Sequence, residues 1–161
     1  MVGVLTIRPS GRDDLAAVDA LLARAYPRLL KPDYPPSVMV TALPILARAR
    51  PELVGCATYY LAECAEVLVG AGGWTRLRWA GTAEVRHLVC DDRQVRQGIG
   101  RALMARIFAE AGAAGIIRLD CQATRTAVPF YLAMGFEVIG AIEVALRPGI
   151  TFPAVAMQRS L

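Results

Sequence analysis

The sequence predicts a single α/β domain in which a mixed, mostly antiparallel sheet carries helices on both faces. The chain has 161 residues, the usual size for one hydrophobic core. Its first half contains strand-like stretches that follow one another as a hairpin, whereas later strands alternate with segments of helical periodicity. Consecutive strands followed by strand–helix units predict this architecture over residues 1–161.

The N-terminal part is predicted to contain one strand and two helices. Residues 2–8 alternate between apolar and polar side chains, as in a half-buried strand. Residues 13–26 place apolar side chains at helical spacing and begin near good capping residues. Residues 27–36 are rich in proline, so we expect an irregular segment there. Residues 38–50 are expected to form a helix weakened by its internal proline.

The remainder alternates strands and helices around a glycine-bearing turn. A hairpin is expected over residues 56–63 and 66–74, which are rich in apolar and β-branched side chains. The next strand, residues 82–90, ends at a polar cluster and leads through the turn into a helix over residues 101–111. We then expect a strand over 115–123, a helix over 128–134, and strands over 136–146 and 151–158 joined around Pro148-Gly149.

The turn carries two glycines, Gly98 and Gly100, just before the helix. Such a turn aims several backbone N–H groups at one point, where the positive end of the helix dipole adds to them. Glycine lets an anionic group approach the backbone without a Cβ in the way. The third glycine of a dinucleotide-binding fingerprint is replaced by Leu103, and no Gly-Lys-Ser/Thr follows. The turn therefore predicts a phosphate or pyrophosphate site of another kind.

A second motif lies downstream, where Phe130-Tyr131-Leu132-Ala133-Met134-Gly135-Phe136 forms a short helix ended by glycine. Together with Val95-Arg96-Gln97-Gly98-Ile99-Gly100, this chain resembles the GNAT superfamily of acetyl-CoA-dependent N-acetyltransferases. The start of the chain, Leu5-Thr6-Ile7-Arg8-Pro9 followed by Asp13-Asp14-Leu15, resembles the first strand and helix of that family. The resemblance spans nearly the whole chain, although residues 26–77 match only in pattern.

The resemblance implies acetyl-CoA as cosubstrate and a set of residues that hold it. The strand before the turn splays from its neighbour in this family, so its free backbone groups take the pantetheine arm. Two positions depart from the family, since Val95 stands where Gln or Arg is usual and Thr124 where Asn is frequent. The cofactor-binding residues expected are Leu88, Val89, Cys90, Val95, Arg96, Gln97, Gly98, Ile99, Gly100, Arg101 and Thr124.

Acetyl transfer to an amine needs a base that removes the ammonium proton and an acid for the departing thiolate. The resemblance implies Glu84 as the base and Tyr131 as the acid. His87, the only histidine, is an alternative base with a suitable unperturbed pKa. Strand alternation places His87 on the face opposite to Glu84, which favours Glu84. Glu63 and Glu66, beside the hairpin turn, are weaker alternatives.

The acceptor is expected to be a primary amine on a small molecule, and its identity stays open. In this family the pocket is walled by the segments that correspond here to residues 26–36 and 147–153. Aromatic side chains are available for such a wall, and Asp33 or Glu63 for contact with a cation. The aromatic candidates are Tyr26, Tyr34, Tyr59, Tyr60, Trp74 and Phe152.

Composition excludes several other classes of protein. No apolar run approaches the roughly 18 to 20 residues that span a membrane, and the N-terminus lacks the pattern of a signal peptide. The net charge of +4 comes from scattered arginines with Lys31 as the only lysine, so nucleic-acid binding is not expected. The four cysteines show no paired spacing, so we expect no metal and a cytoplasmic protein with reduced thiols. They are Cys56, Cys64, Cys90 and Cys121.

We expect the enzyme to act as a homodimer. Two other interpretations of the function stay open. A catalytically silent CoA-binding module would keep Gly98 and Gly100 but use Glu84 and Tyr131 only structurally. A nucleic-acid-binding protein would need a continuous basic face. Measurable acetyl transfer to any amine excludes the first reading, and a map of the surface potential decides the second.

Overall fold

The computed structural model describes residues 3–161, so the start of the strand predicted from residue 2 lies outside them. The described residues form one seven-stranded sheet in the order β1-β2-β3-β4-β5-β7-β6. Every neighbouring pair is antiparallel except β4 and β5. The strands are β1 (Leu5–Pro9), β2 (Tyr59–Cys64), β3 (Val67–Arg76), β4 (Thr82–Cys90), β5 (Arg118–Ala123), β6 (Glu137–Arg147) and β7 (Ile150–Ser160).

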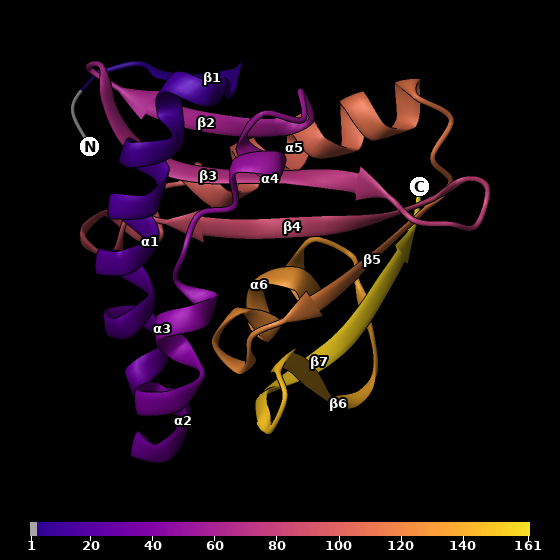
Figure 1. Cartoon of the computed structure of the whole chain (residues 1–161). Coiled ribbons are helices and arrows are strands. Elements are labelled where there is room, and N and C mark those ends of the chain that lie inside the picture. The colour runs from indigo at the N-terminus through magenta and orange to yellow at the C-terminus, as the bar shows by residue number, and fades with distance from the viewer. Residues whose placement is uncertain (1–2) are drawn as a thin grey trace.

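Helices cover both faces of the sheet, as the sequence predicted (Figure 1). One cluster of buried apolar side chains packs α5 and α6 against one face, and a second packs α1, α3 and α4 against the other. The helices are α1 (Leu15–Leu30), α2 (Pro36–Thr41), α3 (Leu43–Leu46), α4 (Pro51–Val54), α5 (Ile99–Ala113) and α6 (Val128–Ala133). In the described part of the chain, no helix is both long and apolar enough to cross a membrane.

The predicted helix boundaries are wrong between residues 27 and 54. Helix α1 continues through Pro27 to Leu30, because Tyr26 and Leu30 are both buried in the second cluster and hold the last turn in place. The single helix expected over 38–50 is split into α2 and α3, with Pro44 in the first turn of α3, where a missing N–H costs no helical hydrogen bond. Helix α4 was not predicted.

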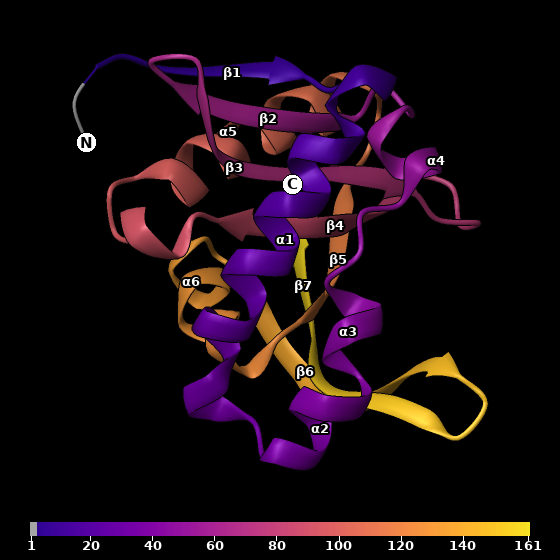
Figure 2. The same ribbon diagram turned by 60° about the vertical axis from the view of Figure 1, so that its left-hand side comes forward.

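The two halves of the sheet diverge in the middle. Strands β4 and β5 pair only from Thr82↔Arg118 to Glu84↔Asp120, and beyond this point they separate (Figure 1). Strand β5 then pairs with β7, and β7 with β6, so these three strands form the second half of the sheet, which turns away from β1 to β4. The hairpin of β6 and β7 extends past α2 and α3 in Figure 2. This divergence positions the candidate site.

Candidate active site

A cleft of about 270 Å³ lies where β4 and β5 separate. The wall from β4 runs from Glu84 to Leu88, and the opposite wall comes from the end of β5, from α6 and from the β6–β7 hairpin. Side chains of α1 and α3 and the residue before α4 close the remaining side. The residues that line the cleft are Tyr26, Leu46, Arg50, Glu84, Val85, Arg86, His87, Leu88, Gln122, Ala123, Thr124, Ala127, Tyr131, Val144, Leu146, Phe152 and Ala154.

A β-bulge interrupts β4 next to the cleft. Gly73 lies opposite Arg86 and Ala71 opposite Val89, so two residues of β4, His87 and Leu88, face the single residue Gly72. His87 has φ of +42°, a conformation uncommon outside glycine. A Cβ at Gly72 would overlap the Leu88 side chain and come within 3.2 Å of its Cα. The bulge therefore requires glycine on β3.

The bulge makes the predicted face assignment wrong after Arg86. An extra residue reverses the alternation, so Val85 packs in the first cluster and Val89 in the second. His87 was expected on the face opposite to Glu84, yet both line the cleft. The signal that would have found the bulge is the run Gly72-Gly73, because glycine inside a strand frequently marks one.

The strand before the turn leaves one side of its backbone without a sheet partner. From Val85 to Cys90, β4 pairs with β3 but forms no ladder with β5 among the described residues. Leu88 and Cys90 pack toward α5, and Val89 is buried on the other face. Their side chains thus belong to the core, and the free backbone edge is the part available to a ligand such as a pantetheine arm.

The glycine turn lies between β4 and α5. Gly98 caps α5 with φ of +79°, and Arg96 before it has φ of +62°. The first hydrogen bond of the helix runs from the Ala102 N–H to the Gly98 carbonyl, so the preceding N–H groups have no helical acceptor. Arg96 and Arg101 are exposed beside them. This is a cationic helix N-terminus suited to a phosphate group.

Gly100 has a different reason for being glycine. A Cβ there would lie 3.1 Å from Cε1 of Phe130 and 3.4 Å from Sγ of Cys90. The two sequence motifs therefore meet, since Phe130 of the second motif packs against Gly100 of the first. Burial raises the pKa of the Cys90 thiol to about 11, so this group stays protonated under the turn.

Asp91 anchors the start of the turn to α1. Its carboxylate is fully buried, accepts a hydrogen bond from the Arg93 N–H at 2.9 Å, and lies 2.7 Å from Nη2 of Arg24. Burial opposes its ionisation, but the hydrogen bonds from Arg93 and the charge of Arg24 outweigh burial and lower the pKa to about 2. Sequence reasoning missed this residue, because nothing local indicates a partner 67 positions earlier in the chain.

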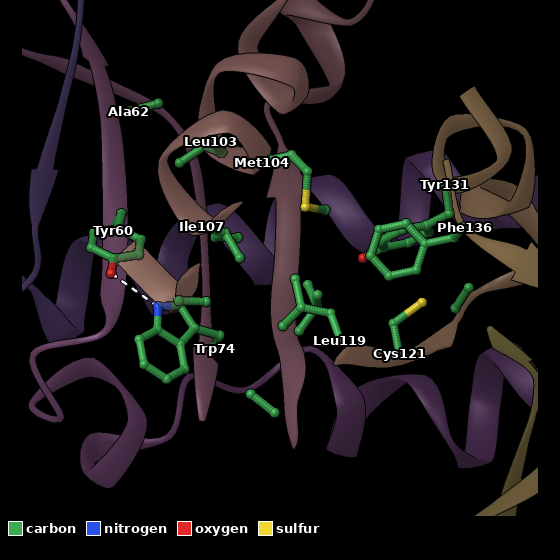
Figure 3. Packing of buried hydrophobic residues seen from close by; sticks show 14 of the residues in the cluster. Tyr60, Ala62, Trp74, Leu103, Met104, Ile107, Leu119, Cys121, Tyr131 and Phe136 are labelled. Carbon is green, nitrogen blue, oxygen red and sulfur yellow. Dashed lines mark hydrogen bonds between the residues drawn. The ribbon is translucent and has the colours of Figure 1, made fainter. Parts of the chain in front are cut away.

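Helix α6 presents Tyr131 to the cleft. The Thr124 hydroxyl accepts a hydrogen bond from the Ala127 N–H at 3.2 Å and so begins the turn that leads into α6. The Tyr131 ring packs edge-on against Phe130 and Phe136, with centroids 5.4 and 5.1 Å away. Figure 3 shows its hydroxyl directed toward the side of the cluster that holds Met104 and Leu119. Burial raises its pKa well above 10.

Glu84 lies at the point where β4 and β5 part. Its carboxylate is half-buried, and burial raises its pKa, with Arg86 opposing the rise and Asp120 adding to it. Burial, together with the charges of Arg50 and Arg86, lowers the pKa of His87 to about 4. At neutral pH the imidazole is therefore uncharged and a weak base. A carboxylate with a raised pKa is the better proton acceptor of the two.

Several side chains expected in an acceptor pocket are engaged elsewhere. Tyr60 and Trp74 belong to the cluster under α5 and hydrogen-bond each other at 3.1 Å (Figure 3). Asp33 accepts a hydrogen bond from Thr126, and Glu63 pairs with Arg8. Of the aromatic candidates, only Tyr26 and Phe152 line the cleft. Tyr34 and Tyr59 contact residues that line it. Tyr34 stacks on Phe152, and Tyr59 donates to the His87 carbonyl.

The fold and the cleft together define a class of protein. A sheet that splays beside a glycine turn at a helix N-terminus is what the resemblance to N-acetyltransferases implied. Residues 45–159 match the acetyltransferase (GNAT) domain family. The chain therefore belongs to the GNAT family and is an acetyl-CoA-dependent N-acetyltransferase. No curated protein is similar enough in sequence to count as a relative.

Solved structures share the fold over their full length. A GCN5-related N-acetyltransferase from Rhodopseudomonas palustris has a TM-score of 0.82 at 21% identity, covering 100% of this chain and 99% of that one. PaiA N-acetyltransferase from Thermoplasma acidophilum, solved with coenzyme A, has 0.78 at 14% identity, covering 98% and 99%. Ribosomal-protein-alanine N-acetyltransferase from Brucella melitensis has 0.65 at 20% identity, covering 97% and 99%. The three carry different functional names on one fold, so the fold does not identify the acceptor.

Proposed function

We propose that this protein moves the acetyl group of acetyl-CoA directly to a primary amine of a small molecule within a ternary complex. The observation that carries the proposal is that strand β4 links the glycine turn to a cleft lined by both Glu84 and Tyr131. The glycine turn begins α5 at one end of β4, Glu84 lies toward the other end, and Tyr131 faces the free edge between them.

The cosubstrate has a defined place in this proposal. Its pyrophosphate binds the N–H groups of Gln97 to Arg101, where the helix dipole and two exposed arginines favour negative charge. Its pantetheine arm pairs with the free backbone edge of Leu88, Val89 and Cys90. The thioester then lies in the cleft beside Tyr131.

The chemistry follows from a set of proton transfers. Glu84 takes a proton from the ammonium, and the neutral amine attacks the thioester carbonyl carbon. The nitrogen of the tetrahedral intermediate then loses its second proton to solvent. The intermediate collapses with cleavage of the carbon–sulfur bond, and Tyr131 gives its proton to the departing thiolate and regains one from solvent. The raised pKa of Glu84 suits the first step, since a base is most effective when its pKa lies nearer the working pH.

An assay of amines with acetyl-CoA, read as release of free thiol, tests this proposal. Transfer to at least one amine, lost on replacing Glu84, is the expected result. A protein that binds CoA but acetylates nothing is the silent module, the competing reading.

We further propose a homodimer in which the free edge of β6 pairs antiparallel with the same strand of a second copy. Val138 and Ile139 are 51% and 57% exposed at this edge. Pairing centred on Ile142 sets Glu137 of each copy opposite Arg147 of the other. Analytical ultracentrifugation of the native chain and of Ile139→Lys tests the dimer. The proposal requires that the native chain is a dimer and that the Ile139→Lys variant is a monomer.

The cytoplasmic location stays a prediction.

A further inference from the structure

Two arginines line the cleft, Arg86 on its β4 wall and Arg50 on the side closed by the segment before α4. Arg86 follows Glu84 by two residues on β4, and Arg50 immediately precedes α4. Arg86 donates from Nη1 to the Thr75 hydroxyl at 3.0 Å. The charges of both arginines contribute to the lowered pKa of His87, which also lines the cleft. Two positive charges and one carboxylate, Glu84, therefore line the cleft.

Neither arginine has a carboxylate within 4.0 Å among the residues that the structure describes. Glu84 is the one carboxylate lining the cleft there, and no ion pair joins it to Arg86. Other arginines of the protein do pair with acidic side chains, at 2.7 to 3.6 Å. These are Arg8, Arg24, Arg28, Arg48, Arg93, Arg106 and Arg118. Eight arginines outside the cleft also form no ion pair with the described residues, so what distinguishes Arg50 and Arg86 is that they line the cleft.

The missing partner is an anion of defined shape. A guanidinium group presents parallel N–H donors that match the two oxygens of a carboxylate, and such charge-assisted bonds are the strong ones. Interactions between charges strengthen where water is partly excluded, as in a cleft. A polyamine would bring only positive charge beside Arg50 and Arg86, and among the described residues Glu84 is the single carboxylate lining the cleft that would offset the repulsion.

We propose that the acceptor is an amine that also carries a carboxylate, such as an amino acid or an amino-acid conjugate. Its carboxylate binds Arg86 and Arg50, and its amine lies toward Glu84. Two residues of extended strand, roughly 7 Å, separate Glu84 from Arg86, a span that one molecule with both groups bridges. The inference rests on the proposed function and narrows its acceptor.

Matched acceptors test the inference on the native protein. Each of a set of amino acids is compared with its decarboxylated amine, for example phenylalanine with phenethylamine and lysine with 1,5-diaminopentane. The kcat/KM at saturating acetyl-CoA is measured by thiol release. For the preferred side chain we expect the carboxylate-bearing member to be favoured by about tenfold or more, the effect of a hydrogen bond to a charged group. Equal or better use of the decarboxylated members throughout overturns the inference.

Variants assign the preference to particular side chains. Arg86→Gln and Arg50→Gln should lower kcat/KM for the amino acid by a larger factor than for its decarboxylated partner. Arg78→Gln removes the same charge from an exposed loop position, so it serves as the control and should leave the ratio unchanged. Comparing the ratio across variants cancels differences in intrinsic amine reactivity. An unchanged ratio in both cleft variants, with normal circular dichroism and CoA affinity, contradicts the assignment.

Failure of this inference is distinguishable from failure of the proposed function. Transfer to amines without any dependence on a carboxylate leaves the acetyltransferase proposal intact and removes only the acceptor class. Binding of CoA without transfer to any member of either set refutes both.

Discussion

Replacing Tyr131 by phenylalanine separates a catalytic tyrosine from a structural one. The substitution keeps the ring, so the edge-on contacts with Phe130 and Phe136 remain. The Tyr131 hydroxyl forms no hydrogen bond with any residue that the structure describes, so its removal leaves no orphaned partner. The hydroxyl is also not one of the buried polar atoms that lack a partner, so we expect its removal to change the free energy of unfolding by less than about 1 kcal/mol.

Turnover of the Tyr131→Phe variant should fall although its stability is kept. A thiolate with an ordinary pKa near 8.5 is a fair leaving group even without an acid. We therefore expect Tyr131→Phe to slow kcat by roughly ten- to a few hundredfold, at the low end of general acid catalysis. Thiol release per folded molecule, measured beside urea denaturation, gives both quantities on one preparation.

Tyr34→Phe is the matched control. The Tyr34 hydroxyl donates to the Pro153 carbonyl at 2.7 Å and accepts from the Arg125 N–H at 2.8 Å. Its loss orphans both groups and should cost about 1 to 3 kcal/mol of stability, with kcat per folded molecule affected far less than in Tyr131→Phe. If Tyr131→Phe lowers stability and leaves turnover normal, the catalytic role of Tyr131 is refuted.

Two further substitutions test the base and the anchor of the turn. Glu84→Gln should lower kcat/KM by roughly a hundredfold and remove the acidic limb of the pH profile, because activity falls as Glu84 is protonated at its raised pKa. Since burial disfavours the charged form of Glu84, the Glu84→Gln protein should be no less stable than the native protein at pH 7. A larger loss of activity in His87→Ala than in Glu84→Gln would contradict the role of Glu84 as the base. Asp91→Asn should cost about 1 to 3 kcal/mol, because Arg24 loses its contact at 2.7 Å and keeps only Asp92 at 3.4 Å, and should weaken CoA binding. The lowered pKa of Asp91 stabilises the fold above its unfolded value near 4, and this contribution is lost as pH falls toward about 2, so native and variant stabilities should converge in acid. A constant stability difference down to pH 2 would contradict that account.

Features with a local signal were predictable from the sequence. Strand β4 was predicted with its observed bounds, and the turn at Gly98 and helix α6 followed because glycine position and side-chain periodicity act over a few residues. The convergence of both motifs was implied only by the family resemblance. The structure gives it a physical basis in the contact between Phe130 and Gly100.

Features that depend on contacts between distant segments were not predictable. Pro27 ends a helix by local rules, yet buried side chains on either side keep α1 intact. The extra residue at His87 moved that side chain into the cleft, which simple alternation excludes. Arg50 gave no signal at all, because its place beside Arg86 depends on how the segment from α3 to α4 folds over the sheet.

The central claim is that CoA binds at the N-terminus of α5, and a calorimetric titration of CoA into Gly100→Val tests it most directly. The added side chain meets Phe130 and Cys90, so the turn must shift and its N–H groups move away from the proposed pyrophosphate site. Gly112→Val, in the same helix, is the control, since a Cβ at Gly112 meets no other atom within 4 Å. We predict that Gly100→Val, folded by circular dichroism, loses CoA affinity by at least about a hundredfold, about 2.7 kcal/mol, while Gly112→Val binds normally. Native affinity in a folded Gly100→Val protein would contradict the claim.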